Sequence, residues 1–418
     1  MSSSADHKAN SMRRRGPRRP EPMRVALLGG FGGGNIGNDA SLAAGIQMLR
    51  QCGHDIVPIA FCPSPRNVED RFGVTAEPVR VQRPGVRKFG LLLGRLIRGT
   101  YRVADVLYAL RIMGSIDALI IPGTGIFEDY GSGKPYKWPL TLAAWFCSAR
   151  IRGTTTALVS VGAGYTEHPV SRFLKLTACR LAHYRSFRDV GSRDAMQSMG
   201  LRTTLDPVVP DIVFSLVTEN RPASLPMRQV VAVPVMNYLG WRKKIPEIGE
   251  RLTRTLSDFC TWLIDEGYEV LLISADWHDA PATDRVAQAI RSATATERHD
   301  CVRVRNVDTI EQFNALISSV TVVVASRYHA IIGALSCGRP TISLSYASKN
   351  DELMNSVGLS NFCQPIEKVD QQLLRRQFRD LVRDWNDHSA RIVERVAEFR
   401  RQFLTEGERV CSLMKHRG

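Results

Sequence analysis

The amino-acid sequence predicts an α/β protein made of two Rossmann-like lobes that face each other across a cleft. From Met23 onward, short runs rich in β-branched residues alternate with helical stretches, a pattern typical of parallel sheets with helices on both faces. The alternation is interrupted by VTENRPASLPMR, residues 217–228, which has two prolines and little apolar periodicity. The 418 residues are enough for two ordinary domains.

These features set the expected domain boundaries. We expect a disordered basic arm over 1–22, a first lobe over 23–218, a linker over 219–228, a second lobe over 229–368 and a C-terminal helical region over 369–418. The nine cysteines are scattered without a C-x-x-C pair. Their spacing argues against a zinc site and against a disulfide framework, and it favours a reducing cytoplasm.

Each expected strand of the first lobe leads into a helical stretch. Asn38 and Asp39 can cap a helix over 39–53, and Ser192 is the expected N-cap of a helix over 191–200. The expected strands lie in RVALLGG (24–30), DIVPIAF (55–61), SIDALIIPGTG (115–125), TTTALVSVGAG (154–164) and AHYRSFRD (182–189).

The second lobe repeats this alternation, and an arginine-rich helical region follows it from about Val369. One strand, in TVVVASRYHAIIGALSCG (321–338), runs directly into a helix. The other expected strands lie in VVAVPVMNY (230–238), YEVLLISADW (268–277), CVRVRN (301–306) and RPTISLSY (339–346). In open α/β sheets ligands bind at the carboxyl ends of strands, so functional residues are expected at the strand exits that line the cleft.

The formal net charge of +15 calls for an anionic partner. Residues 80–112 are strongly basic and carry Leu, Ile, Tyr and Val at helical spacing, so this helix can lie on an anionic membrane surface. The alternative is a helix whose apolar face belongs to the core and whose arginines are solvated. No nucleic-acid recognition motif is present in the sequence, and no nucleic-acid partner is expected.

The first strand exit reads GGFGGGNIGNDA, in which Gly32, Gly34 and Gly37 match the G-x-G-x-x-G pattern of dinucleotide-binding turns. A nicotinamide site also requires an acidic residue at the end of the second strand. That strand ends in Cys62-Pro63-Ser64. The pattern therefore indicates a crowded turn near a ligand, and the redox interpretation is disfavoured.

Three further strand exits carry ionisable side chains. Arg327 and His329 lie where a strand becomes a helix, an arrangement suited to binding phosphate or carboxylate and to transferring a proton; the alternative for His329 is a packing or capping role. Gly125 precedes Glu128 and Asp129, where a carboxylate could accept a proton from a sugar hydroxyl, or Asp129 could stabilise a local turn. Arg188 could be a second anion clamp, or could form an ion pair with Asp189.

Taken in order, these motifs resemble the polysaccharide pyruvyl transferases. The resemblance covers about Arg24 to Leu359 and rests on GGFGGGNIGNDASL, IIPGTGIFED, SVGAG, SFRDVGSRDAMQSMG with a following PDIVFSL, and SRYHAIIGALSCGRPTISLSY. It implies a glycosyltransferase-B-like architecture, with the acceptor on the first lobe and the donor on the second. The implied reaction transfers an enolpyruvyl unit from phosphoenolpyruvate to a sugar, giving a pyruvate ketal.

The resemblance also implies roles for individual residues. His329 would transfer a proton, Asp129 would activate the acceptor, and Arg327 and Arg188 would hold the donor. The other implied substrate-binding residues are Tyr328, which replaces the usual leucine, Gly34, Asn35, Gly37, Asp39 and Gly125. The family turn reads closer to G-N-x-G-D-E, so the acid here, Asp39, is shifted by one position.

We expect no metal and no cofactor, with phosphoenolpyruvate as co-substrate. A basic helix that faces a membrane favours a lipid-linked sugar acceptor. Two alternatives stay open: a nucleotide-sugar glycosyltransferase of the same fold, and a non-catalytic envelope-assembly protein that docks on membranes.

Overall fold

The structure is a computed structural model, and it describes residues 22–53, 55–81, 91–128, 137–216, 229–240 and 244–415, without the side chains of 91–98. Residues 1–21 of the expected arm, the expected linker 219–228 and Asp129 lie outside the described residues.

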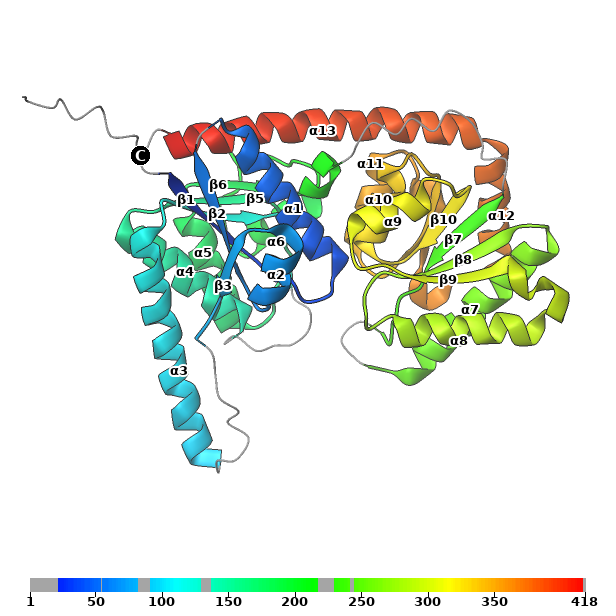
Figure 1. Cartoon of the computed structure of the whole chain (residues 1–418), viewed down its shortest axis with the longest axis horizontal. Helices are drawn as coiled ribbons and strands as arrows, with labels where there is room; N and C mark the ends of the chain where they lie inside the picture. Colours follow the sequence, from blue (N-terminus) through cyan, green and yellow to red (C-terminus); the bar gives the residue numbers. More distant parts are fainter. Residues whose placement is uncertain are drawn as a thin grey trace, which may run out of the picture.

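The first lobe is a parallel sheet of six strands in the order β3-β2-β1-β4-β5-β6, with helices between successive strands (Figure 1). β4 and β5 are buried along their whole length, as expected for parallel strands covered on both faces. The strands are β1 (Met23–Leu28), β2 (Ile56–Cys62), β3 (Thr75–Pro78), β4 (Ala118–Pro122), β5 (Thr155–Val161) and β6 (Tyr184–Phe187). The helices are α1 (Ile36–Gln51), α2 (Pro65–Phe72), α3 (Leu91–Ile112), α4 (Trp138–Arg152), α5 (Pro169–Leu181) and α6 (Val190–Ser198).

The second lobe repeats this topology in the order β12-β11-β10-β7-β8-β9, again all parallel. The prediction of two Rossmann-like lobes is therefore confirmed. The strands are β7 (Val230–Pro234), β8 (Glu269–Ser274), β9 (Val302–Asn306), β10 (Val322–Ala325), β11 (Thr341–Ser345) and β12 (Cys363–Pro365). The helices are α7 (Pro246–Asp265), α8 (Ala280–Ala293), α9 (Ile310–Ile317), α10 (Tyr328–Ser336) and α11 (Ser348–Ser356).

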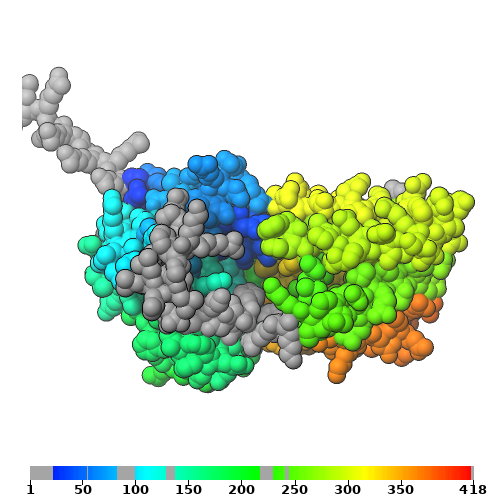
Figure 2. Space-filling model, turned by 90° about the horizontal axis from the view of Figure 1, so that it is seen from below, coloured from blue at the N-terminus to red at the C-terminus, as the bar shows by residue number. Residues whose placement is uncertain are grey.

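Strand order reverses between β1 and β4 in the first lobe and between β7 and β10 in the second. Ligands of doubly wound sheets bind at such switch points. The glycine-rich loop follows β1, and Arg327 follows β10. In Figure 2 the lobes touch where the blue N-terminal segment meets the lime and yellow segments of the second lobe. The two switch points thus face each other.

The C-terminal region forms α12 (Gln371–Arg383) and α13 (Trp385–Lys415), and α13 runs across both lobes (Figure 1). Its buried apolar residues recur every three, four or seven positions, so one face packs on the protein. They include Ile392, Val396, Phe399, Phe403, Val410 and Met414. No helix in the described part of the chain is long and apolar enough to cross a bilayer.

A disulfide joins Cys52, after α1, to Cys411 of α13, with a Cα–Cα distance of 5.4 Å. The scattered cysteines predicted no disulfide framework, and that prediction is wrong for this pair. The two positions are separated by 359 residues and become neighbours only because α13 returns to the first lobe.

Two predicted helix caps are also wrong. Asn35, not Asn38 or Asp39, caps α1, because its Oδ1 accepts hydrogen bonds from the backbone N–H groups of Gly37 and Asn38. In α6 the cap is Asp189, whose carboxylate accepts the N–H of Ser192 at 2.6 Å. Both helices therefore begin earlier than predicted, closer to the cleft.

Candidate active site

The glycine-rich loop after β1 places the start of α1 against the second lobe. Gly34 has a φ of +81°, which favours glycine, and a Cβ there would lie 2.4 Å from the ring of Trp277 in the second lobe. Asn35 donates from Nδ2 to Asp276 Oδ2 across the lobes at 3.5 Å. Gly34 and Asn35 therefore lie at the interlobe contact.

Asp39 holds the loop from within the first lobe. Its Oδ1 accepts the Gly32 N–H at 2.7 Å, and its Oδ2 pairs with Arg71 at 2.5 Å. Burial raises the pKa of this carboxyl. Because both oxygens are engaged, the structure supports a loop-positioning role for Asp39, while direct contact with substrate stays a prediction.

Arg327 lies at the N-cap of α10 and is held by two carboxylates that follow β8. Its guanidinium makes a two-point contact with Asp279, including Nη2 to Oδ1 at 2.7 Å, and lies 3.5 Å from Asp276 Oδ2. The side chain keeps 24% of its exposure. The guanidinium is therefore fixed in orientation and partly neutralised.

His329, in the first turn of α10, packs against the first turn of α1. A Cβ on Gly37 would fall 2.0 Å from His329 Nδ1, so only glycine allows this approach. His329 Nε2 lies 4.0 Å from Asp211 Oδ2, and neither atom has a hydrogen-bond partner among the described residues. Burial lowers the pKa of His329 to about 4, so the imidazole is neutral at pH 7.

Arg188 follows β6 and is the centre of a buried charge cluster, its side chain only 2% exposed. It pairs with Glu128, with Asp189 at 3.2 Å and with Asp211 at 3.5 Å. The ring of Tyr328 lies 4.3 Å from the guanidinium carbon. Both alternatives weighed for Arg188 therefore remain compatible with its position: it forms structural ion pairs, and it lies at the cleft.

Glu128 joins this cluster to the second lobe. Lys349, in the first turn of α11, pairs with Glu128 at 2.9 Å. The carbonyl of Gly125 accepts the N–H of Glu128 at 2.9 Å, and the buried Lys175 ammonium donates to the Glu128 carbonyl at 3.3 Å. These contacts orient the turn that leads to Asp129.

The backbone at the exits of β4 and β5 is held in an unusual conformation. Thr124 has a φ of +66° and Ser160 a φ of +52°, in the left-handed region that side-chain-bearing residues rarely occupy. Such positions persist only where the surroundings fix them, and they cluster at functional sites. Thr124 lies next to the Arg188 cluster, since its carbonyl accepts the Gly162 N–H at 2.8 Å and a Cβ on Gly162 would lie 2.5 Å from the Arg188 guanidinium. Ser160 precedes Val161, whose carbonyl accepts the Arg188 N–H at 3.2 Å.

The structure thus brings His329, Arg188, Tyr328, Gly37 and Gly125 into one region. Arg327, Gly34 and Asn35 lie at the adjoining interlobe contact. Four of the charged partners were not predicted from the sequence, namely Asp211, Asp276, Asp279 and Lys349. A usable signal existed for Asp211, which begins the DIVFSL run after a proline. No cluster of His, Cys, Asp and Glu suited to a metal ion occurs within the described ranges.

Two such lobes, with ionisable side chains gathered where their strand ends face each other, define a protein of glycosyltransferase-B-like fold. Solved structures agree. UDP-GlcNAc 2-epimerase of Methanocaldococcus jannaschii has a TM-score of 0.59 at 10% identity, over 86% of this chain and 93% of that chain. MnaA of S. aureus, in a co-structure with UDP, has a TM-score of 0.58 at 13% identity, over 89% and 91%. Anabaena HepE, in complex with UDP and glucose, has a TM-score of 0.56 at 13% identity, over 93% and 98%.

Identities this low show the fold alone. The family is shown by the sequence: the model of the polysaccharide pyruvyl transferases matches residues 35–348, so the chain belongs to that family. No curated protein matches the chain. The resemblance stated from the motifs is confirmed.

Replacing Gly37 with alanine tests the contact between α1 and His329. The added methyl would displace the imidazole, and misplacing a reacting group by about 1 Å can lower the rate about 100-fold. We expect Gly37→Ala to lower turnover by about that factor while the protein stays folded by circular dichroism. Gly99→Ala is the control, because no described atom lies within 4 Å of its Cβ position. Equal activities of the two variants would contradict the prediction.

The low pKa of His329 should appear in the pH dependence of stability. The ordinary pKa of 6.5 falls to about 4 on folding, so the unfolded chain binds the proton first as the pH drops. The contribution of His329 to the free energy of unfolding is therefore intact above pH 6.5 and is lost as the pH falls to about 4, a difference of about 3 kcal/mol. Urea titrations between pH 6.5 and about 4 should show that the free energy of unfolding falls less steeply with pH in His329→Asn than in the wild-type protein. A wild-type slope identical to that of the variant would contradict the prediction.

Proposed function

We propose that this pyruvyl transferase uses phosphoenolpyruvate as donor and forms a pyruvate ketal on a sugar of a cell-envelope polysaccharide or glycolipid. The observation that carries the proposal is His329. Its imidazole, 16% exposed, belongs to the first turn of α10 and packs on the first turn of α1, with Nε2 lacking a hydrogen-bond partner among the described residues and Asp211 beside it. An enol donor requires a proton on carbon, and this imidazole is positioned to transfer one.

The surroundings suit an anionic donor. Within the described residues no side chain caps α10 or α11, so their first backbone N–H groups have no side-chain acceptor. Helix N-termini of this kind bind phosphate and carboxylate. Arg327 begins α10, and Lys349 lies in the first turn of α11. These groups would hold the phosphate and carboxylate of phosphoenolpyruvate.

The proposed chemistry proceeds in two additions at C2 of the donor. His329, which takes up a proton as the trianionic donor binds, delivers that proton to the methylene carbon, and the first sugar hydroxyl adds to the cationic C2 and loses its proton to a carboxylate. The bond from C2 to the phosphate oxygen then breaks, and inorganic phosphate leaves. A second hydroxyl of the same sugar adds to C2 and returns a proton to His329, which closes the ketal. Asp129 is our proposed base, with the oriented turn at Glu128 directly before it.

A donor assay tests the proposal. The purified protein is incubated with phosphoenolpyruvate and an envelope glycan extract, and phosphate release is measured together with the mass of the glycan. We expect phosphate release that depends on the glycan, and a pyruvate-sized mass gain on it. A parallel reaction with UDP-sugars addresses the glycosyltransferase alternative, because several proteins of similar fold were solved with UDP or a UDP-sugar. Consumption of a UDP-sugar without consumption of phosphoenolpyruvate would overturn the proposal.

We further propose that α3 contacts an anionic bilayer that carries the acceptor. This helix extends beyond the rest of the first lobe (Figure 1) and exposes Val103 and Leu107, each 60% accessible, next to Arg102 and Arg111. The acid on this helix, Asp105, accepts the Val81 N–H at 3.1 Å and so faces the body of the lobe. Apolar side chains flanked by arginine suit an anionic lipid surface.

Sedimentation with phosphatidylglycerol vesicles tests this contact. The double variant Val103→Ser/Leu107→Ser should bind about tenfold more weakly, because it removes apolar area from the interface. Leu205→Ser is the matched control, since Leu205 is 91% exposed and lies in the loop that follows α6. Equal loss in the control, or a wild-type protein that stays in the supernatant, would contradict the proposal.

A further inference from the structure

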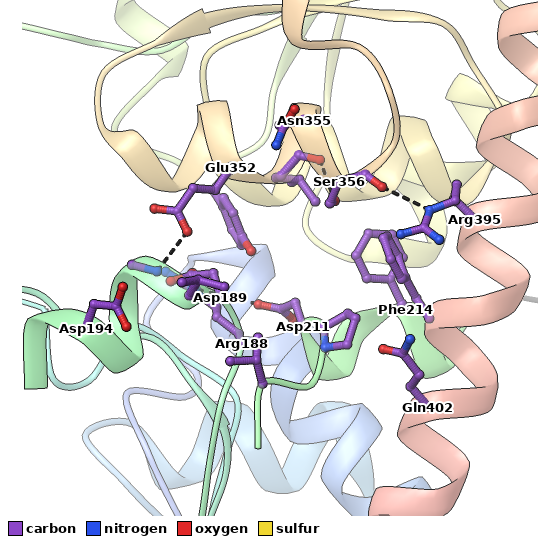
Figure 3. A pocket seen from close by; sticks show the side chains of 17 residues that line it. Arg188, Asp189, Asp194, Asp211, Phe214, Glu352, Asn355, Ser356, Arg395 and Gln402 are labelled. Atoms are coloured by element: carbon purple, nitrogen blue, oxygen red, sulfur yellow. Dashed lines mark hydrogen bonds and ion pairs between the residues drawn. The ribbon is translucent and has the colours of Figure 1, made fainter. Parts of the chain in front are cut away.

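A cavity of about 490 Å³ lies between the lobes on the side that α13 covers (Figure 3). The start of α6 and the loop from Val208 to Phe214 form its wall in the first lobe, α11 forms its wall in the second lobe, and α13 borders both. The cavity is thus built from three separate parts of the chain that meet only in the assembled fold.

The cavity adjoins the active-site cluster. Arg188, Tyr328 and Asp211 line the cavity and also form part of the cluster. Asp211 Oδ2 is 4.0 Å from His329 Nε2, and the rings of Tyr328 and His329 are 5.4 Å apart. A molecule in the cavity would therefore lie one side chain away from the imidazole that we assign to proton transfer.

The charge of the cavity wall disfavours an anionic ligand. Carboxylates outnumber cations there, and each of the two arginines already has acidic partners: Arg188 in its cluster, and Arg395 paired with Glu398. The acidic lining residues are Asp189, Asp194, Asp211 and Glu352. A phosphate or a carboxylate would be repelled, so the cavity does not suit the donor.

The same wall suits a sugar. Sugar hydroxyls donate hydrogen bonds to carboxylates and to the amides of Asn355 and Gln402, and the C–H face of a pyranose packs on phenyl rings. Phe214 and Phe399 line the cavity and pack on each other, with ring centroids 5.2 Å apart. Asp211 adds a second indication: its side chain is fully buried, and its Oδ2, although 3.5 Å from Arg188 Nη1 and 4.0 Å from His329 Nε2, accepts no hydrogen bond from any described residue. A hydroxyl donor in the cavity, after a small shift, would satisfy that oxygen.

The cavity is lined partly by residues inside the range that matches the family model and partly by residues after that range. The family model ends at residue 348, whereas the lining residues of α11 and α13 run from Glu352 to Gln402. The strand exits that carry His329 and Arg188 lie inside the matched range. Residues that distinguish one acceptor from another are expected where the chain departs from the shared pattern.

We propose that this interlobe cavity is the acceptor subsite and that it binds a neutral hexose unit. The reacting hydroxyls of the hexose would lie beside Asp211, on the side of the cavity nearest to His329. This assignment rests on the proposed function, in which the pyruvyl group moves from the donor to a sugar. It implies that residues of α11 and α13 select the acceptor.

Substitutions at the mouth of the cavity test the assignment. Asn355 and Gln402 are exposed positions on α11 and α13 that line the cavity, so Asn355→Trp and Gln402→Trp would fill its entrance without disturbing the core. Asn386→Trp is the matched control, because Asn386 is exposed on α13 and does not line the cavity. The probes are methyl pyranosides of glucose, galactose, mannose and their N-acetylamino forms, followed by saturation-transfer NMR, with phosphoenolpyruvate binding measured by calorimetry.

We expect the wild-type protein and Asn386→Trp to bind at least one methyl hexoside, and both cavity variants to bind it at least tenfold more weakly. Phosphoenolpyruvate affinity should stay within twofold in all four proteins. Unchanged hexoside binding in the cavity variants, no hexoside binding by the wild type, or displacement of the hexoside by inorganic phosphate would each overturn the assignment. Failure of phosphoenolpyruvate to bind any of the proteins would instead overturn the proposed donor, while the hexoside result would still decide the cavity.

Discussion

Replacing His329 with asparagine is expected to lower kcat by a factor of about 100 to 10,000. Asparagine keeps a polar side chain of similar reach but cannot carry a proton to carbon. The imidazole lies between Gly37 and Asp211 without taking part in the ion pairs of Arg188, so the variant should fold normally. Steady-state phosphate release, with phosphoenolpyruvate varied at saturating acceptor, gives kcat and KM separately. The loss should appear in kcat, because the groups proposed to bind the donor are unchanged.

The control for this variant is His388→Asn. His388 lies on α13, packs against Phe362, and likewise has its pKa lowered by burial. A general effect of removing a partly buried imidazole would appear in both variants, whereas a loss of proton transfer would appear only at position 329. If His329→Asn kept more than a tenth of the wild-type kcat, the assignment of proton transfer to His329 would be wrong.

Donor binding should also change the protonation of His329. In the free protein its pKa is about 4, and Asp211 raises it while Arg188 and Lys349 lower it. A bound trianion adds negative charge nearby and so raises the pKa toward neutrality. Calorimetry at pH 6.5 in two buffers of different ionisation enthalpy should therefore show proton uptake on phosphoenolpyruvate binding. The uptake should be smaller in His329→Asn.

The fold and the strand exits of the site could be predicted from the sequence, because both depend on local pattern. Apolar runs such as VVAVP of β7 indicate buried parallel strands wherever they occur. Arg327 and His329 could be placed at a strand-to-helix turn because TVVVAS runs directly into the helix that follows. That turn lies at a switch point of the strand order. Ligands of such sheets bind at the carboxyl ends of the strands beside the switch point, so the site could be expected there.

The partners of the arginines could not be predicted, because they depend on distances across the sheet. Asp279 lies 48 residues before Arg327, and Glu128 lies 60 residues before Arg188. Each acid follows a different strand from its arginine, and only the strand order brings them together. The sequence therefore predicted Arg327 and Arg188 as anion-binding residues, but not the carboxylates that orient and partly neutralise them.

The start of α1 was misplaced for a local reason. Asn35, Asn38 and Asp39 are all good N-cap residues, so residue type could not choose among them. Gly32 and Gly34 take left-handed conformations, with φ of +74° and +81°. The helix begins directly after this turn, at Ile36, with Asn35 as its N-cap. The earlier start places Gly37, rather than a loop residue, under His329.

Replacing Arg188 with methionine is expected to destabilise the protein by about 3 to 5 kcal/mol. The methionine side chain follows the aliphatic part of arginine but is shorter and has no charge, so the carboxylates of Glu128, Asp189 and Asp211 lose their shared cation. The Arg188 side chain is 2% exposed, which leaves little room for water to replace it. Urea unfolding at pH 7 measures the loss. Arg193→Met is the control, because Arg193 and Asp194 form an exposed pair, and it should change stability by less than about 1 kcal/mol.

A double variant separates the charge imbalance from a simple packing defect. Asp211 Oδ1 accepts the Val213 N–H at 3.1 Å, and asparagine can keep that bond while removing the negative charge. Adding Asp211→Asn to Arg188→Met should therefore recover about 1 to 2 kcal/mol of the lost stability, because one buried carboxylate no longer lacks a cation. A packing defect would instead leave the double variant no more stable than Arg188→Met. That result would contradict the explanation that Arg188 stabilises the fold by neutralising the surrounding carboxylates. The recovered double variant should still turn over poorly, because the acid beside His329 and the cation at the cleft are both gone.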